Sequence, residues 1–101
     1  MFIYSKDGSK KVNIDTATLL GDVARDRKIY QQGDNTQLWR SKSGAYFKGM
    51  CLENARGGGS GICSCMHFIP ISKDAAKFWV MDYYGAEALA RFGFGDDAEE
   101  I

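Results

Sequence analysis

A short segment of this chain alternates residues that bind soft metal ions or act as nucleophiles. Cys63, Cys65 and His67 occupy every second position of the run Cys-Ser-Cys-Met-His. On an extended strand these side chains point to one face, because side chains alternate with a period of two. Cys51 could add a fourth soft ligand, and four Cys and His ligands suit tetrahedral zinc.

The spacing of these residues argues against a metal site. Structural zinc sites usually separate paired ligands by about two to four residues, whereas alternate residues on a straight strand lie about 6.5–7 Å apart. We therefore expect an inward strand face of small apolar cysteines, a hydrogen-bonded His67, and no bound metal or cofactor. The alternatives are a small metal-stabilised regulatory module and a cysteine–histidine nucleophile pair, for which no third, orienting group is evident.

A glycine-rich segment has the composition of an anion-binding loop. It consists of Arg56, Gly57, Gly58, Gly59 and Ser60. Glycine lets backbone N–H groups converge on a phosphate, and arginine supplies a bidentate donor. The P-loop pattern requires Gly-Lys-Ser/Thr at the start of a helix, whereas a strand-like run follows here, so a Walker-type NTPase is excluded. The segment is either a connector or a contact for an anion or nucleotide.

Cations and aromatic residues accompany the clearest predicted hairpin, whose arms are residues 36–40 and 45–51, with Ser43-Gly44 at the turn. Its candidate ligand-binding residues are Trp39, Arg40, Lys42, Tyr46 and Lys48. Aromatic rings can stack on a base, although they more often form the core of a small sheet. Together with the glycine segment, this hairpin suits a phosphate-bearing ligand, and it suits an acidic protein partner equally.

The elements that position these residues form a small α+β domain, expected to span residues 1–94, with an acidic flexible tail at 95–101. Asp7-Gly8 predicts a hairpin between residues 2–4 and 12–14. A further strand is expected from about Thr18 to Arg25, and residues 62–71 also read as extended. We predict an antiparallel sheet of about four to five strands, packed against one or two C-terminal helices.

The predicted helix begins after a capping Ser72. Its apolar stripe, spaced three and four residues apart, consists of Ala76, Trp79, Val80 and Tyr83. Gly85 is expected to interrupt it, and residues 86–92 to form a second short helix. This pattern predicts that the stripe packs on the sheet.

Composition narrows the classes of function. The 101 residues carry 13 Lys and Arg against 13 Asp and Glu, and this balance argues against a generic nucleic-acid binder. No apolar run approaches the roughly 18–20 residues that span a bilayer, and three cysteines fit reducing cytoplasm, so we expect a cytoplasmic protein without a membrane partner. The chain has one His and no recognised catalytic signature, so we expect no enzyme.

The order of segments resembles a diffuse family of small phage and mobile-element proteins of Gram-positive bacteria. Two of the matching features come early: a Tyr-x-x-Asp-Gly hairpin at residues 4–8 and an Asp-Thr-Ala-Thr-Leu-Leu-Gly segment at 15–21. A Leu-aromatic-Arg-x-Lys-x-Gly-x-aromatic-Phe hairpin follows at residues 38–47. The last feature is an Ile-Pro-Ile-Ser strand end at residues 69–72, before a helix with Ala at 76 and Trp at 79. Relatives often carry a His-Gly-Glu-Gly-Gly-like stretch where this chain has residues 48–53. The resemblance implies a fold outline and a genetic neighbourhood, and it brings no catalytic residue.

The resemblance makes counter-defence the expected role, in the cytoplasm of a bacterial host. The chain would be a non-catalytic binding protein that inhibits a host immune effector or sequesters its nucleotide second messenger. One mechanism is an anti-CRISPR-like protein–protein inhibitor that uses exposed aromatics and the hairpin tip. The other is a nucleotide sponge, which we expect to be a homo-oligomer.

Overall fold

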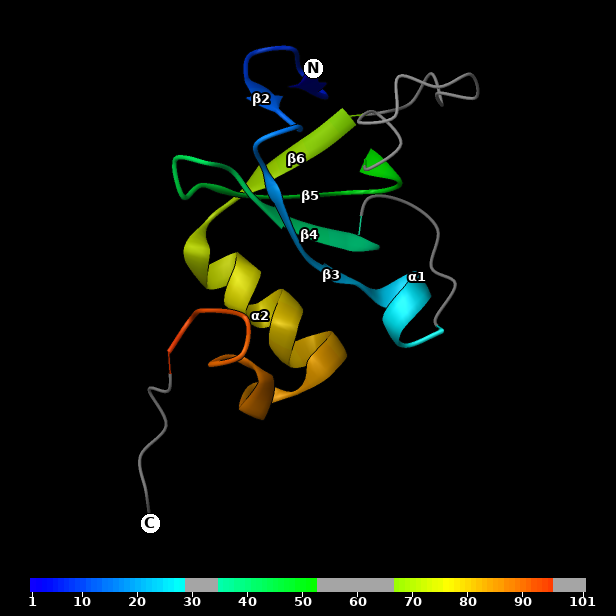
Figure 1. Ribbon diagram of the computed structural model, residues 1–101, viewed down its shortest axis with the longest axis vertical. Coiled ribbons are helices and arrows are strands. Elements are labelled where there is room, and N and C mark those ends of the chain that lie inside the picture. The colour runs from blue at the N-terminus through cyan, green and yellow to red at the C-terminus, as the bar shows by residue number, and fades with distance from the viewer. Residues whose placement is uncertain (29–34, 53–66, 96–101) are drawn as a thin grey trace.

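The computed structural model describes residues 1–28, 35–52 and 67–95 (Figure 1). The elements follow one another as β1 (Phe2–Ser5), β2 (Lys11–Asn13), β3 (Thr18–Asp22), α1 (Val23–Asp26), β4 (Gln37–Arg40), β5 (Tyr46–Gly49), β6 (His67–Ile71), α2 (Lys73–Tyr84) and the 3₁₀ helix η2 (Ala86–Ala88). Strands precede one main helix, which confirms the α+β class.

The strands form one curled sheet in the order β2-β1-β6-β5-β4-β3, with α2 against one of its faces (Figure 1). It has six strands rather than four or five, because β2 and β3 both pair and occupy its two edges. The sheet is also mixed rather than purely antiparallel. Strands β1 and β6 run parallel, with Tyr4 opposite His67, whereas all other neighbours are antiparallel.

Apolar side chains are buried on both faces of the sheet. On β4 the adjacent residues Leu38 and Trp39 are both fully buried, and because they are adjacent on a strand they belong to different clusters. The cluster around Trp39 also contains Ile3, Ile14, Ala17, Phe47, Leu52 and Phe68. The cluster around Leu38 lies toward α2 and contains Val23, Ala76, Trp79, Val80, Ala88, Phe92 and Phe94.

Both predicted hairpins form. Strands β1 and β2 pair around the Asp7-Gly8 turn, where Gly8 has φ of 74°. Strands β4 and β5 pair around Gly44, which has φ of 94°. Glycine suits both turns because a left-handed backbone costs it no clash with a Cβ atom.

The strand expected from Thr18 to Arg25 is shorter than predicted. It ends at Asp22, whose Oδ1 accepts a hydrogen bond of 3.3 Å from the Arg25 backbone N–H and so caps α1. A carboxylate at this position satisfies a donor that has no partner within the helix. The helical turn places Asp26 and Arg27 beside the free edge of β3.

Helix α2 follows the prediction closely. Ser72 Oγ accepts from the Ala75 backbone N–H at 3.1 Å, and Ala76, Trp79 and Val80 are buried. The helix ends at Gly85, where φ is 90°. The predicted second helix is only the short η2, followed by turns that carry Phe92 back to the sheet. None of the described helices has the length and apolarity needed to span a membrane.

Candidate functional site

A pocket of about 620 Å³ runs beside edge strand β3. Its apolar lining comes from Leu19, Leu20 and Phe92. Leu19 packs with one core cluster and Leu20 with the other, as adjacent residues on a strand do, and the register of β3 shifts between Leu19 and Gly21. A bulge at an edge redirects side chains and opposes pairing with a further strand.

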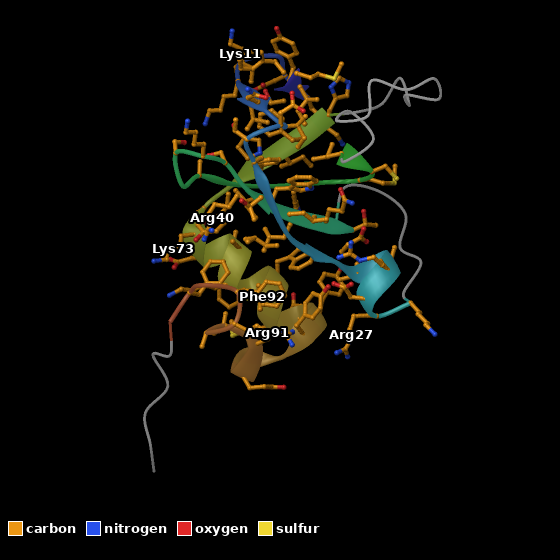
Figure 2. All side chains as sticks on the ribbon, viewed as in Figure 1. Lys11, Arg27, Arg40, Lys73, Arg91 and Phe92 are labelled. Atoms are coloured by element: carbon orange, nitrogen blue, oxygen red, sulfur yellow. The ribbon has the colours of Figure 1, made fainter. Side chains whose placement is uncertain are left out.

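Three arginines from separate parts of the chain line the same pocket. Arg40 ends β4, Arg27 caps the C-terminal end of α1, and Arg91 lies in the turns after η2. We call this site the arginine pocket, defined by Arg27, Arg40 and Arg91 together with Tyr84 and Phe92. Figure 2 shows Arg91 and Phe92 between Arg40 on one side and Arg27 on the other.

The two ends of the arginine pocket are set by the length of β3. Arg40 lies opposite Thr18 at the start of β3, and Arg27 follows α1, which begins directly after Asp22. At about 3.3 Å per residue, the strand from Thr18 to Asp22 spans roughly 13 Å. The cations are therefore distributed along the pocket rather than gathered at one point.

The acidic group in this pocket is already engaged. Asp26 Oδ1 accepts from Arg25 Nε at 2.9 Å, and Asp26 Oδ2 accepts from the Tyr84 hydroxyl at 2.9 Å. The hydrogen bond from Arg25 is the main cause that lowers the pKa of the Asp26 carboxyl. Burial, followed by the hydrogen bond to Asp26, raises the pKa of Tyr84 well above its ordinary value. Asp26 is thus held ionised and Tyr84 protonated.

Aromatic rings support two of the pocket arginines. The guanidinium carbons of Arg27 and Arg91 each lie 5.9 Å from the centre of the Tyr84 ring, and that of Arg91 lies 5.2 Å from the Phe92 ring. Such cation–π contacts hold a guanidinium without neutralising it. Within the described part of the chain, no carboxylate forms an ion pair with Arg27, Arg40 or Arg91. Their N–H donors remain available to an anion.

A glycine, Gly93, lets the backbone approach Arg40, the pocket arginine for which no aromatic contact was described above. Gly93 has φ of 88°, and a Cβ at this position would lie 3.4 Å from Arg40 Nη1. A larger residue would therefore be strained and would also crowd the guanidinium. Gly93 and Arg40 thus line the arginine pocket side by side.

The candidate ligand-binding residues of the β4–β5 hairpin do not share one site in the structure. Trp39 is completely buried, with its Nε1 donating to Gln37 Oε1 at 3.1 Å and its ring stacked on Phe47, so it is a core residue with no surface for a ligand. Lys48 Nζ donates to Asn35 Oδ1 at 2.6 Å beside α2. Of the hairpin set, only Arg40 lines the arginine pocket.

The other two hairpin residues line a different cleft. Lys42 lies in the exposed turn between β4 and β5, and Tyr46 is half-buried with its ring 5.1 Å from that of Phe94. The remaining predicted site residues, Arg56, Gly57, Gly58, Gly59 and Ser60, fall outside the described residues. They stay a sequence-based prediction.

The proposed metal ligands are not brought together in what the structure describes. Cys63 and Cys65 fall outside the described residues, while Cys51 is exposed on a left-handed backbone with φ of 55°. His67 is half-buried at the start of β6, and its Nδ1 is buried with no described hydrogen-bond partner. Residues 1–28, 35–52 and 67–95 contain no group of three or more Cys, His, Asp or Glu placed to hold a metal ion.

Sequence reasoning missed Arg27, Arg91 and Tyr84. A local signal existed for one of them, because Arg91-Phe92-Gly93 joins a cation, an aromatic ring and a glycine at a turn. The convergence itself depends on α1 and the end of α2 meeting across β3, which no local pattern reveals. No protein-family model, curated protein or solved structure matches this chain.

Proposed function

We propose that this chain is a non-catalytic binding protein whose arginine pocket holds a phosphate-bearing nucleotide. The observation that carries the proposal is the convergence of Arg27, Arg40 and Arg91 on one pocket without described carboxylate partners. Arginine forks match phosphate oxygens, and guanidinium donors in a partly apolar pocket bind them strongly.

The distribution of charge favours a ligand with more than one anionic group. Arg40 lies at one end of β3 and Arg27 beyond the other, roughly 13 Å along the strand. Between them, Leu19, Leu20 and Phe92 offer apolar contact of the kind that a base or ribose fills. A nucleotide with two or more phosphates has both components.

The protonation states in the pocket support binding rather than catalysis. General acid–base catalysis works best when the pKa of the acting group lies near the working pH. Here the pKa of Asp26 is lowered and that of Tyr84 is raised, so both shifts lead away from neutrality. The two groups also occupy one another through their hydrogen bond.

Counter-defence remains our proposal for the biological setting, and it rests on the resemblance to phage and mobile-element proteins. In that setting the protein sequesters a nucleotide second messenger in the cytoplasm of the bacterial host. A protein–protein inhibitor is the second candidate, favoured by aromatic side chains at the surface. Phe2 and Tyr4 on β1 are 52% and 51% exposed, and Phe78 on α2 is 62% exposed.

Calorimetric titration tests the nucleotide proposal. The probes are cyclic di-AMP, cyclic di-GMP, cyclic AMP and ATP, with inorganic phosphate as the minimal anion. We expect saturable binding of at least one nucleotide, abolished by Arg27→Ala or Arg40→Ala at an unchanged melting temperature. Lys11→Ala is the matched control, because Lys11 lies on β2, away from the arginine pocket (Figure 2).

The two candidate functions give opposite results. If no nucleotide binds, or if the arginine variants bind as well as the natural protein, the nucleotide proposal is rejected. A protein inhibitor binds no nucleotide, yet loses capture of a host effector when Phe78 or Tyr4 is replaced by Ala. Native mass spectrometry of protein purified from its host adds the number of copies and any retained nucleotide.

A further inference from the structure

A second cleft, of about 420 Å³, lies between edge strand β2 and the turn that joins β4 to β5. Its apolar lining includes Phe47 and Phe68 of the core cluster around Trp39, and Val12, which is partly buried and packs against that cluster. The exposed Lys10 and Lys42 contribute from opposite sides. We call this site the lysine cleft. It shares no lining residue with the arginine pocket, and no described carboxylate lines it.

The β-sheet register shows which backbone groups of β2 point away from its partner β1. The Ile14 N–H donates to Met1 O at 3.0 Å, and the Ser5 N–H donates to Lys10 O at 2.9 Å. In an antiparallel ladder the hydrogen-bonded pairs alternate with non-bonded pairs. Because Met1–Ile14 and Ser5–Lys10 are hydrogen-bonded pairs, the alternation makes Phe2–Asn13 and Tyr4–Lys11 pairs without backbone hydrogen bonds to each other.

It follows that part of β2 offers unused backbone groups at the free edge of the sheet. Lys11 directs both its N–H and its C=O away from β1, and Asn13 directs its N–H the same way. The Asn13 C=O is already used, since it accepts from the Thr16 N–H at 3.3 Å. The Lys11 N–H, the Lys11 C=O and the Asn13 N–H have no hydrogen-bond partner among the described residues and can serve a strand laid along β2.

We propose that the lysine cleft binds an extended acidic peptide segment of another protein, which pairs with β2 as an additional strand. Backbone hydrogen bonds to Lys11 and Asn13 fix the segment, and its alternate side chains enter the cleft above Phe47 and Phe68. Carboxylates of the segment meet the ammonium groups of Lys10 and Lys42.

The positive charge of the lysines along β2 favours an acidic peptide over a second copy of the chain. Lysines on an edge strand oppose the pairing of two identical edges, because like charges would be brought together. A segment that alternates acidic and apolar residues removes that repulsion and covers the apolar lining of the cleft. The proposal is independent of the nucleotide site, since the two pockets have separate linings.

Fluorescence anisotropy with a labelled peptide of four Val-Glu repeats tests the charge requirement. We expect saturable binding that weakens by at least about tenfold in the Lys10→Glu/Lys42→Glu variant. The Lys28→Glu/Lys73→Glu variant makes the same charge change at exposed residues outside the cleft, and it should retain the affinity of the natural protein. Absence of saturable binding, or equal weakening in both double variants, overturns the proposal.

Backbone methylation of the peptide tests strand addition separately. Two versions of the peptide carry N-methyl groups on alternate residues, one on the valines and one on the glutamates. Only one set of N–H groups can face β2, because the groups alternate between the two edges of a strand. We expect one version to bind like the parent and the other to lose binding. Equal affinities of the two versions overturn strand addition.

Discussion

The Tyr84 hydroxyl donates a hydrogen bond of 2.9 Å to Asp26 Oδ2 and so joins the end of α2 to α1 across 58 positions of sequence. This contact fixes the Tyr84 ring, against which the guanidinium groups of Arg27 and Arg91 lie. The other oxygen of the same carboxylate, Asp26 Oδ1, pairs with Arg25 Nε at 2.9 Å. One hydrogen bond between α1 and the end of α2 thus positions the aromatic ring that two of the pocket arginines contact.

Replacing Tyr84 by Phe should change how stability depends on alkaline pH. Burial and the bond to Asp26 raise the folded-state pKa above the ordinary 10.0. A raised folded-state pKa gives stability that is fully present below the unfolded pKa and is lost as pH rises toward the folded one. We expect Tyr84→Phe to lower the free energy of unfolding by about 1 kcal/mol at neutral pH, the net contribution of a hydrogen bond.

The difference between the two proteins should then shrink as pH rises above 10.0, because only the natural protein loses the Tyr84 contribution there. Urea denaturation followed by circular dichroism at neutral and alkaline pH measures both free energies. A difference that stays constant over this range would show that the hydroxyl is not held protonated by the fold.

Trp79 should be a major contributor to stability, whereas its neighbour Phe78 should contribute little. Trp79 is 6% exposed and packs between β3 and the rings of Tyr83 and Tyr84, and its Nε1 donates to the Asn35 carbonyl at 2.9 Å. Trp79→Ala should cost roughly 3–5 kcal/mol, the range for deleting a large buried aromatic side chain.

Phe78→Ala is the matched control, because Phe78 is 62% exposed on the same helix. It should change the free energy of unfolding by no more than about 0.5 kcal/mol, as is usual for surface positions. A cost below about 1 kcal/mol for Trp79→Ala in denaturant melts would contradict the packing of α2 on the sheet.

Local signals predicted the elements of this fold well. Asp7-Gly8 and Ser43-Gly44 marked both hairpins, and Ser72 and Gly85 marked the two ends of α2. Each of these signals acts within a few residues, through a turn that needs positive φ or through a cap that satisfies a free N–H. They therefore operate before any tertiary contact has formed.

The long-range relationships were not predictable in this way. The parallel pairing of β1 with β6 places Tyr4 opposite His67, which lies far away in the sequence. The early end of β3 has a local cause that sequence reasoning missed, because the Asp22 carboxylate caps α1. The limit on long-range relationships also applied to the binding residues. Trp79 was predicted to be a core residue and is one, whereas Trp39 was a predicted ligand-binding residue and is completely buried. Arg27 and Arg91 gained a common pocket only when α1 met the end of α2.

The β1–β2 hairpin should become less stable in acid because the Asp7 carboxylate becomes protonated. Hydrogen bonds from Ser5 Oγ, the Ser9 N–H and Ser9 Oγ, at 2.6, 2.9 and 2.7 Å, lower the pKa of Asp7 from 3.8 to about 2. A lowered folded-state pKa gives stability that is present above pH 3.8 and is lost as pH falls toward 2.

Amide hydrogen exchange of Ile3 and Val12, which lie opposite each other in the hairpin, measures this effect. After correction for intrinsic rates, their protection should fall over that pH window in the natural protein. Asp7→Asn should show weaker protection at neutral pH and no additional loss in the window, because it has no carboxylate to protonate. An acid response that survives in Asp7→Asn would assign it to another group.

The arginine pocket should require guanidinium groups and not merely positive charge. Arg91 lies 5.2 Å from the Phe92 ring and 5.9 Å from the Tyr84 ring, and the Gly93 backbone lies close to Arg40 Nη1. Arg40→Lys and Arg91→Lys keep the charge but lose the planar fork that bonds two phosphate oxygens at once. For whichever nucleotide binds the natural protein, each change should weaken binding by about tenfold or more, since a hydrogen bond to a charged group contributes about 1.5–3 kcal/mol.

Calorimetry at two salt concentrations separates charge from geometry. The lysine variants should keep the salt dependence of the natural protein, because the number of cations is unchanged, while Arg40→Ala and Arg91→Ala should show a weaker dependence. If the lysine variants bind as tightly as the natural protein, the pocket acts as a diffuse field of positive charge. The ligand would then be chosen by its total charge rather than by the fit of its phosphates to Arg40 and Arg91.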